Sequence, residues 1–273
     1  MPGMDHQVFE KFRSIVYEHS GIFLNETKEA MVASRLAKRM RILGIKHYEE
    51  YLQFLLQDQS GDEIINFLDV IATNVTSFFR EPEHFDFLGD LITTWIGQRK
   101  ERIRIWSAAA STGQEPYSIA ITAFIVAGAQ AKDIRILATD ISTKALRAAQ
   151  IGEYSSPTLD NVPDSIKAKF FVKKRVGEET IYCIKEQIRN LVIFKRINLA
   201  YPPFTIPQKL DIVFCRNVMI YFDSIVRTRL IAEMYRLLNP GGYLIVGHAE
   251  SLACIKTDFI CLKPSIYQKP YKT

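Results

Sequence analysis

Residues 102–119, which read RIRIWSAAASTGQEPYSI, constrain the fold of this chain more than any other segment. The apolar and aromatic residues around Trp106 are typical of a buried strand. Small residues follow at positions 107–113, and apolar residues then recur at helical spacing from Tyr117 onward. A strand, a turn of small residues and a helix are how an α/β nucleotide site begins, because the turn lets a ligand reach backbone N–H groups at the helix start.

The same segment could be an ordinary connection between a strand and a helix, but two acidic residues favour a ligand site. Only Gly113 in the turn is a glycine, so the segment lacks the Gly-x-Gly-x-x-Gly fingerprint. Glu115 opens the predicted helix, and Asp140 ends the next apolar run, residues 134–140. A carboxylate at the end of that second strand can accept both hydroxyls of a ribose, which favours a nucleotide-like ligand.

Length and composition are those of a soluble globular protein. The 273 residues suggest about two domains, and 48% of them are hydrophobic and 24% charged. No apolar run approaches the roughly 20 residues of a membrane span, and the first residues lack the apolar core of a signal peptide. Cys183, Cys215, Cys254 and Cys261 show neither zinc-type nor disulfide-type spacing, so we expect buried free thiols, a cytoplasmic location and no metal site.

Residues 8–71 carry four apolar stripes at helical spacing, with no strand pattern between them. They predict an all-helical domain over residues 1–80. Ser60 and Glu63 have the spacing of a capping box, which predicts the start of the fourth helix.

The second of these helices is cationic, with Lys28, Arg35, Lys38 and Arg39 opposed by acids only near its start. One interpretation is a solvated face, and the other is a docking face for an acidic partner. Aromatic residues are not interleaved with the cations, as a binder of single-stranded nucleic acid would require. The lack of such aromatic residues favours an acidic protein helix over nucleic acid as the partner.

Residues 73–82 are polar and interrupt the helical pattern, and Pro82 suits the first turn of a following helix. The segment is either a capped linker or one wall of a cleft between domains. In the second case Asn74, Thr76 and Arg80 would face a ligand.

Strands and helices alternate from residue 103 onward, which predicts a doubly wound α/β domain over residues 81–273. The alternation stops between about residues 155 and 190, where two short strands, 169–173 and 180–185, flank a turn. We expect an inserted antiparallel β subdomain there, with a sheet edge that could accept a peptide. Beyond it, one strand pattern leads to Asn198, another runs over residues 211–218, and residues 239–242 form a turn before a strand at 243–246.

Four segments, in this order along the chain, resemble the chemotaxis receptor methyltransferases, the CheR family of class I S-adenosylmethionine-dependent methyltransferases. They are residues 73–80, 106–117, 138–141 and 214–222. The resemblance covers nearly the whole chain. Gln114 is a departure, because the family more often has an acidic residue there, whereas Glu115 is kept.

The resemblance implies a Rossmann-like methyltransferase sheet with an N-terminal helical domain and an inserted β subdomain. It implies methyl transfer from S-adenosylmethionine to glutamate carboxylates of chemoreceptors, which gives methyl esters and serves sensory adaptation. By this similarity Arg80 and Tyr221 lie nearest the transferred methyl. The residues implied to line the cofactor site are Asn74, Thr76, Arg80, Glu115, Asp140, Asn198, Leu199, Asn217 and Val218.

The partner implied by the resemblance is a chemoreceptor methylation helix, and the cationic helix with Lys28, Arg35, Lys38 and Arg39 is expected to dock it. A receptor C-terminal peptide could bind the β subdomain. We expect no nucleic acid, no membrane insertion and a monomer.

The residue types agree with this chemistry. A glutamate carboxylate, with a pKa of about 4.3, is ionised at neutral pH, so methyl transfer to it needs no general base. None of the five histidines is assigned a role.

Three alternatives remain: a methyltransferase for nucleic acids or small molecules, a nicotinamide dehydrogenase, and a non-catalytic receptor-binding module. The sequence lacks an Asn-Pro-Pro-aromatic motif, which counts against a nucleic-acid methyltransferase. It lacks the glycine fingerprint, which counts against a dehydrogenase. Its cofactor-lining residues are intact, which counts against a non-catalytic module.

Overall fold

The structure is a computed structural model that describes residues 4–128 and 133–271. The start of the chain forms a four-helix domain whose apolar stripes meet in one core around Phe12, Tyr51 and Phe67. This confirms the predicted all-helical domain. Its helices are α1 (His6–Ser20), α2 (Glu29–Leu43), α3 (Tyr48–Gln57) and α4 (Asp62–Ile71).

The capping box predicted at the start of α4 is wrong. The N-cap is Gly61, with φ 76° in the left-handed region, and Asp58 accepts the N–H of Glu63 at 2.7 Å. The Glu63 side chain instead turns inward, where Arg39 donates to it and the Tyr51 hydroxyl donates at 2.7 Å. A carboxylate held by these two partners cannot reach back to cap the helix.

The rest of the chain is built on a seven-stranded sheet in the order β6-β2-β1-β7-β8-β10-β9. The first five strands in this order run parallel, and β10 runs antiparallel to both of its neighbours. The strands are β1 (Ile103–Ser107), β2 (Ile134–Asp140), β6 (Val192–Arg196), β7 (Leu210–Cys215), β8 (Leu238–Val246), β9 (Ile260–Lys263) and β10 (Ile266–Gln268).

Helices cover both faces of this sheet, as a doubly wound fold requires. Ile105 and Phe214 pack into a core with α5 (Glu83–Gly97) and α6 (Gln114–Ala127). The neighbouring residues Trp106 and Val213 pack into a separate core with α10 (Ser224–Leu237). Alternate residues of one strand point to opposite faces, so the two cores lie on opposite sides of the sheet. The fold class predicted from the alternation is confirmed.

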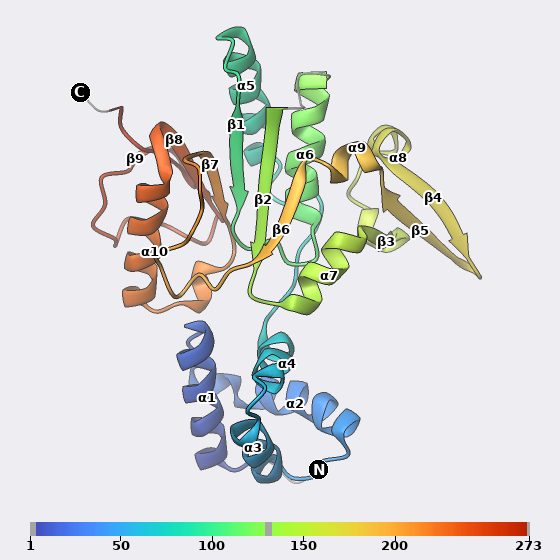
Figure 1. Cartoon of the computed structure of the whole chain (residues 1–273), viewed down its shortest axis with the longest axis vertical. Coiled ribbons are helices and arrows are strands. Elements are labelled where there is room, and N and C mark those ends of the chain that lie inside the picture. The colour runs from blue at the N-terminus through green and yellow to red at the C-terminus, as the bar shows by residue number, and fades with distance from the viewer. Residues whose placement is uncertain (1–3, 129–132, 272–273) are drawn as a thin grey trace.

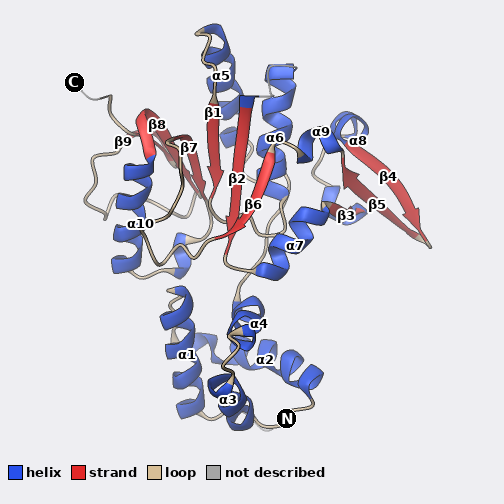
Figure 2. Ribbon diagram, viewed as in Figure 1, coloured by secondary structure: helices blue, strands red, loops and turns tan. Residues whose placement is uncertain are grey.

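The insertion forms its own three-stranded antiparallel sheet, β3-β5-β4, whose hairpin projects from the side of the molecule (Figure 2). It comprises β3 (Glu153–Ser155), a 3₁₀ turn (Ser156–Leu159), α8 (Asp164–Phe170), β4 (Phe171–Val176) and β5 (Glu179–Ile184). Two short helices, α7 (Thr143–Ile151) and α9 (Glu186–Arg189), flank it.

Two local predictions in this domain are wrong. Lys169 and Phe170 end helix α8 instead of starting a strand, because Phe170 packs on Phe124 of α6 with ring centroids 5.9 Å apart. Residues 239–242 are not a turn before a strand. They belong to β8, which begins at Leu238, and the pairing of β7 with β8 shifts register between Leu210 and Ile212.

The cysteines differ partly from expectation. All four are free thiols, as predicted, but only Cys215 is buried, whereas Cys254 and Cys261 are exposed. Cys261 lies on β9, the edge strand, whose residues are all exposed. Over the described ranges, no helix has both the length and the apolar character needed to cross a bilayer.

Candidate functional site

A cavity of about 550 Å³ lies between the helical domain and the carboxyl ends of the parallel strands. Figure 1 shows the arrowheads of β1 and β2 directed toward the helical domain. The volume falls within the roughly 300–1,000 Å³ of small-molecule sites. All ten predicted site residues line this cavity: Asn74, Thr76, Arg80, Glu115, Asp140, Asn198, Leu199, Asn217, Val218 and Tyr221.

Asp140 ends β2 at the wall of the cavity, and its side chain is oriented by two backbone groups. The N–H of Ser111 donates to one carboxylate oxygen at 2.8 Å, and the N–H of Ser142 donates to the other at 2.9 Å. Burial raises the pKa of Asp140, although these two hydrogen bonds oppose the shift. Each oxygen keeps further lone-pair capacity, so the carboxylate can accept hydroxyl donors from a ligand.

The turn after β1 presents small side chains to the cavity, among them Ala108, Ala109 and Ser111. Gly113, at the end of this turn, is closely packed. Its φ is 99°, and a Cβ there would lie 2.7 Å from the Tyr154 hydroxyl and 2.9 Å from the Ala149 Cβ. Packing against the helix and the insertion, not ligand access, therefore requires glycine at this position.

Glu115 belongs to a buried ion-pair network that sequence reasoning did not foresee. Ser107 donates to one of its oxygens at 2.7 Å and Arg216 to the other at 2.9 Å. Arg216 also pairs with Glu81 at 3.0 Å and donates to the carbonyl oxygen of Arg80. Burial raises the pKa of Glu115, and the charge of Arg216 opposes this shift. The network ties the start of α6, the end of β7 and the linker together.

A second missed residue, Glu250, holds the loop that follows β7. Glu250 is buried, and Asn217 has φ 57° in the left-handed region. A Cβ at Gly247 would lie 2.5 Å from the side-chain nitrogen of Asn217 and 3.0 Å from its backbone nitrogen, so a side chain at this position would crowd the loop. The Glu250 carboxylate accepts backbone N–H bonds from Asn217 (2.6 Å), Val218 (2.9 Å), Met219 (2.7 Å), Ile220 (3.3 Å) and Gly247 (2.8 Å).

The only sequence signal for Glu250 is an acid that closely follows a buried strand. Nothing in the spacing relates it to residues 217–220, which lie some thirty positions earlier.

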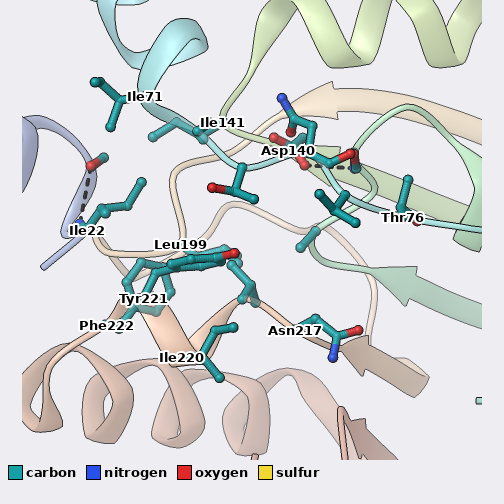
Figure 3. Close-up of a pocket in the computed structure, with 18 of the residues that line it drawn as sticks. Ile22, Ile71, Thr76, Asp140, Ile141, Leu199, Asn217, Ile220, Tyr221 and Phe222 are labelled. Carbon is teal, nitrogen blue, oxygen red and sulfur yellow. Dashed lines mark hydrogen bonds between the residues drawn. The ribbon is translucent and has the colours of Figure 1, made fainter. Parts of the chain in front are cut away.

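The two residues predicted to lie nearest the methyl, Arg80 and Tyr221, both line the cavity. Arg80 is half-buried and donates to the carbonyl oxygen of Val75 at 3.3 Å. The carbonyl oxygen of Tyr221 accepts the N–H of Phe23 at 2.8 Å, which joins the loop after β7 to the helical domain. In Figure 3 Tyr221 groups with Phe222 and Leu199, across the cavity from Asp140.

Asn74 and Asn198 hold the walls of the cavity together. The carbonyl oxygen of Asn74 accepts from the Ser111 hydroxyl at 3.1 Å. The side chain of Asn198 donates to the carbonyl oxygen of His19 at 2.7 Å and accepts from the N–H of Ala200 at 3.1 Å. Both residues therefore connect the helical domain or the linker to the sheet.

Two of the four cations predicted to dock a partner, Arg35 and Arg39, have partners inside the protein. Arg35 donates to the carbonyl oxygens of Ile71 and Ala72 and to the Thr73 hydroxyl. Arg39 forms a bidentate pair with Glu63. Lys28 and Lys38 are exposed, and Lys28 also lines the cavity.

Comparison with known proteins identifies the family. Residues 7–72 match the model of the CheR methyltransferase all-alpha domain, and residues 74–267 match that of the CheR methyltransferase SAM-binding domain.

Curated relatives agree with this match. Chemotaxis protein methyltransferase 2 of Pseudomonas aeruginosa is 40% identical over 89% of this chain and 86% of its own length. The chemotaxis protein methyltransferase of Borreliella burgdorferi is 36% identical, with 93% and 91% covered. That of Escherichia coli is 34% identical, with 95% and 89% covered. The chain therefore belongs to the CheR family of S-adenosylmethionine-dependent chemotaxis methyltransferases.

Proposed function

We propose that this protein methylates glutamate side chains of chemoreceptor helices in the cavity between its two domains, with S-adenosylmethionine as the methyl donor. The observation that carries the proposal is that ten residues from five separate sequence segments line one cavity. The same cavity reaches the cationic helix α2 through Arg35 and through Lys28, the N-cap residue that precedes α2, so donor and acceptor sites adjoin.

The residues of the cavity fit this cofactor. Asp140 has acceptor capacity left for the two ribose hydroxyls, since the backbone N–H groups of Ser111 and Ser142 each bond to a different oxygen of its carboxylate. The small side chains at Ala108 and Ala109 leave room for a ligand beside β1. Asn74, Thr76, Glu115, Asn198, Leu199, Asn217 and Val218 complete the proposed cofactor contacts.

When bound, S-adenosylmethionine supplies an electrophilic methyl group on a sulfonium sulfur. The protein's task is then to align an ionised carboxylate with that methyl and to exclude water. Arg80 is proposed to orient the acceptor carboxylate through its guanidinium, and Tyr221 to fix the acceptor from the opposite wall. An ionised nucleophile needs no proton transfer, so no general base is assigned.

Receptor docking is proposed to use the exposed cations of the α2 region. Methylation helices present glutamates, so a cationic surface raises the encounter rate and sets the register of the acceptor helix. Lys28 and Lys38 serve this role directly. Arg35 and Arg39 contribute by holding α2 against α4 through their internal bonds.

A second receptor contact is proposed at the β subdomain. Strand β4 is one of the two edges of the small sheet and carries Lys173, Lys174 and Arg175, all exposed. A receptor tail that ends in a carboxylate could add to this edge as a further strand. The protein is proposed to act as a cytoplasmic monomer.

Radiolabelled S-adenosylmethionine and receptor-rich membranes test the proposal. We expect label in the receptor that mild alkali releases as methanol, the behaviour of a carboxyl methyl ester. Label that resists alkali would indicate methylation of nitrogen and would contradict the glutamate assignment. A receptor with its methylation glutamates replaced by alanine is the matched control and should remain unlabelled.

A further inference from the structure

Two histidines and two glutamates meet beside the cofactor cavity, where the start of α5 faces the loop after β8. Glu81, His84 and His248 each offer one atom able to bind a metal, and the three atoms lie within 4.8 Å of one another. The two imidazole rings meet edge to face, with centroids 5.3 Å apart. Sequence reasoning assigned neither histidine a role.

His84 is the residue that points to a ligand. Its side chain is fully buried, yet neither ring nitrogen has a hydrogen-bond partner within the described residues. An unsatisfied buried polar group costs about 1–3 kcal/mol, so such a group calls for an explanation. The Nδ1 atom lies 3.4 Å from the carboxylate of Glu81, toward the cluster.

The protonation state of His84 suits metal binding. Burial lowers its pKa to about 4, and the nearby guanidinium of Arg216 adds to the shift. The ring is therefore neutral at physiological pH, which is the form of imidazole that binds metals.

Two carboxylates at the cluster, those of Glu81 and Glu83, offer negative charge to a cation, whereas the guanidinium of Arg216 opposes it. Burial would raise the pKa of Glu81, but the hydrogen bond and charge of Arg216 outweigh it, so the pKa lies below its usual value. Arg216 is shared between Glu81 and Glu115. Glu83 contacts Nε2 of His248, an arrangement in which a carboxylate orients a metal-binding imidazole.

We propose that Glu81, His84 and His248 form a binding site for a divalent transition metal of the zinc class. Two imidazoles and one carboxylate, with water as a fourth ligand, are a donor set that suits Zn²⁺, whereas Mg²⁺ and Ca²⁺ take oxygen ligands. Tetrahedral zinc with bonds of about 2.1 Å needs donor atoms roughly 3.4 Å apart. His248 is exposed and lies in a loop, so its side chain can close this distance.

The site is connected to the cofactor cavity through Glu81 and Arg216. A metal ion on Glu81 competes with Arg216 for the same carboxylate. Arg216 in turn holds Glu115 at the cavity wall and directly precedes Asn217. Metal binding is therefore expected to lower the affinity for S-adenosylmethionine.

Calorimetric titration of the full-length protein with Zn²⁺ tests the site directly. We expect one Zn²⁺ per chain, no heat with Mg²⁺, and at least a tenfold loss of Zn²⁺ affinity in His248→Ala. Because His248 is exposed, this variant should fold normally. His47→Ala removes another exposed histidine, in the helical domain, and should bind Zn²⁺ like the wild type.

A second variant separates the proposed site from surface thiols. Replacing both exposed cysteines, Cys254→Ser with Cys261→Ser, should leave Zn²⁺ binding unchanged. Binding that survives in His248→Ala but disappears from the cysteine variant would assign the metal to thiols and overturn the proposal. The absence of any Zn²⁺ binding by the wild type would overturn it as well.

Discussion

The carboxylate of Glu250 accepts a 2.6 Å hydrogen bond from the backbone N–H of Asn217, a residue held at positive φ. The same carboxylate accepts from the next three backbone N–H groups. One acidic side chain thus determines the path of the loop that brings Asn217, Val218 and Tyr221 to the cavity. The loop carries a non-glycine residue in a disfavoured conformation, which persists only where its surroundings hold it.

We expect Glu250→Gln to lower both stability and cofactor affinity. The amide replaces one acceptor oxygen with a donor that faces backbone N–H groups, and hydrogen bonds to a charged group are worth about 1.5–3 kcal/mol each. Urea unfolding and calorimetric titration with S-adenosylmethionine measure the two effects. The control is Glu178→Gln, which changes an exposed acid in the β4–β5 turn. Wild-type affinity in a folded Glu250→Gln variant would show that the loop does not need this carboxylate.

Asp140→Asn should weaken S-adenosylmethionine binding while the protein stays folded. The substitution keeps the size of the side chain but removes its charge and half of its acceptor capacity. The expected loss is about 1.5–3 kcal/mol, or roughly 10- to 150-fold in dissociation constant. Asp160→Asn, at an exposed position, is the matched control. Unchanged affinity in Asp140→Asn would remove this residue from the proposed cofactor site.

Arg80→Ala and Tyr221→Phe are expected to reduce the rate of methyl transfer more than cofactor affinity. Both residues are proposed to align the acceptor, and loss of alignment can cost roughly 100-fold in rate. Single-turnover methylation measures the chemical step, and titration with S-adenosylmethionine measures binding. Either variant would lose its proposed role if its single-turnover rate stayed within about threefold of the wild type.

The pH dependence of stability should report on Glu233, which supports the segment after Leu199. Glu233 accepts the N–H of Phe204 at 2.7 Å and a bond from Arg236 at 2.7 Å. The hydrogen bond from Arg236 is the main reason that the pKa of Glu233 lies below its usual value. A lowered folded-state pKa gives stability that is present above the unfolded pKa of about 4.3 and is lost as pH falls below it.

On acidification from pH 7 to pH 3.5, the urea concentration at the midpoint of unfolding should therefore fall less in Glu233→Gln than in the wild type. Urea melts at both pH values, with Glu49→Gln as an exposed control, measure the difference. An equal loss of stability on acidification in the wild type and Glu233→Gln would contradict the assignment.

Local patterns were enough to predict most elements, whereas the full set of residues around the cavity was implied by the resemblance to the CheR family. Apolar periodicity located the four helices and the strands because each element buries one stripe or alternates between two cores. The domain boundary at residue 80 stays a prediction.

The partners of polar side chains could not be predicted in this way. Glu250 reaches residues 217–220 only through the order of strands β7 and β8 in the sheet. The sequence predicts that Arg35 and Arg39 lie on a solvated or docking face. Each of them directly precedes a buried residue, Leu36 and Met40 respectively. Positions beside a buried stripe can turn toward a neighbouring helix, and here α4 supplies the acceptors.

The cationic helix allows stability and docking to be separated by substituting two adjacent residues, Lys38 and Arg39. Arg39 pairs with Glu63, and the two side chains are 19% and 5% exposed. Its removal leaves Glu63 without that guanidinium. We expect Arg39→Ala to cost about 2–3 kcal/mol of unfolding free energy, below the 3–5 kcal/mol of a fully buried pair. Lys38→Ala, at an exposed position, should change stability by no more than about 0.5 kcal/mol.

If α2 docks the acceptor helix, receptor methylation should depend on Lys38, even though this residue contributes little to stability. At low ionic strength Lys38→Glu should slow methylation of intact receptor, because it reverses a charge facing an acidic partner, and added salt should reduce the difference from the wild type. A single surface charge is worth about 0–1 kcal/mol, so Lys28→Glu is combined with it to enlarge the effect. S-adenosylmethionine affinity, measured by titration, tells a docking defect from damage to the cavity that Lys28 lines. Methylation at the wild-type rate by the folded double variant at low salt would leave α2 with a structural role alone.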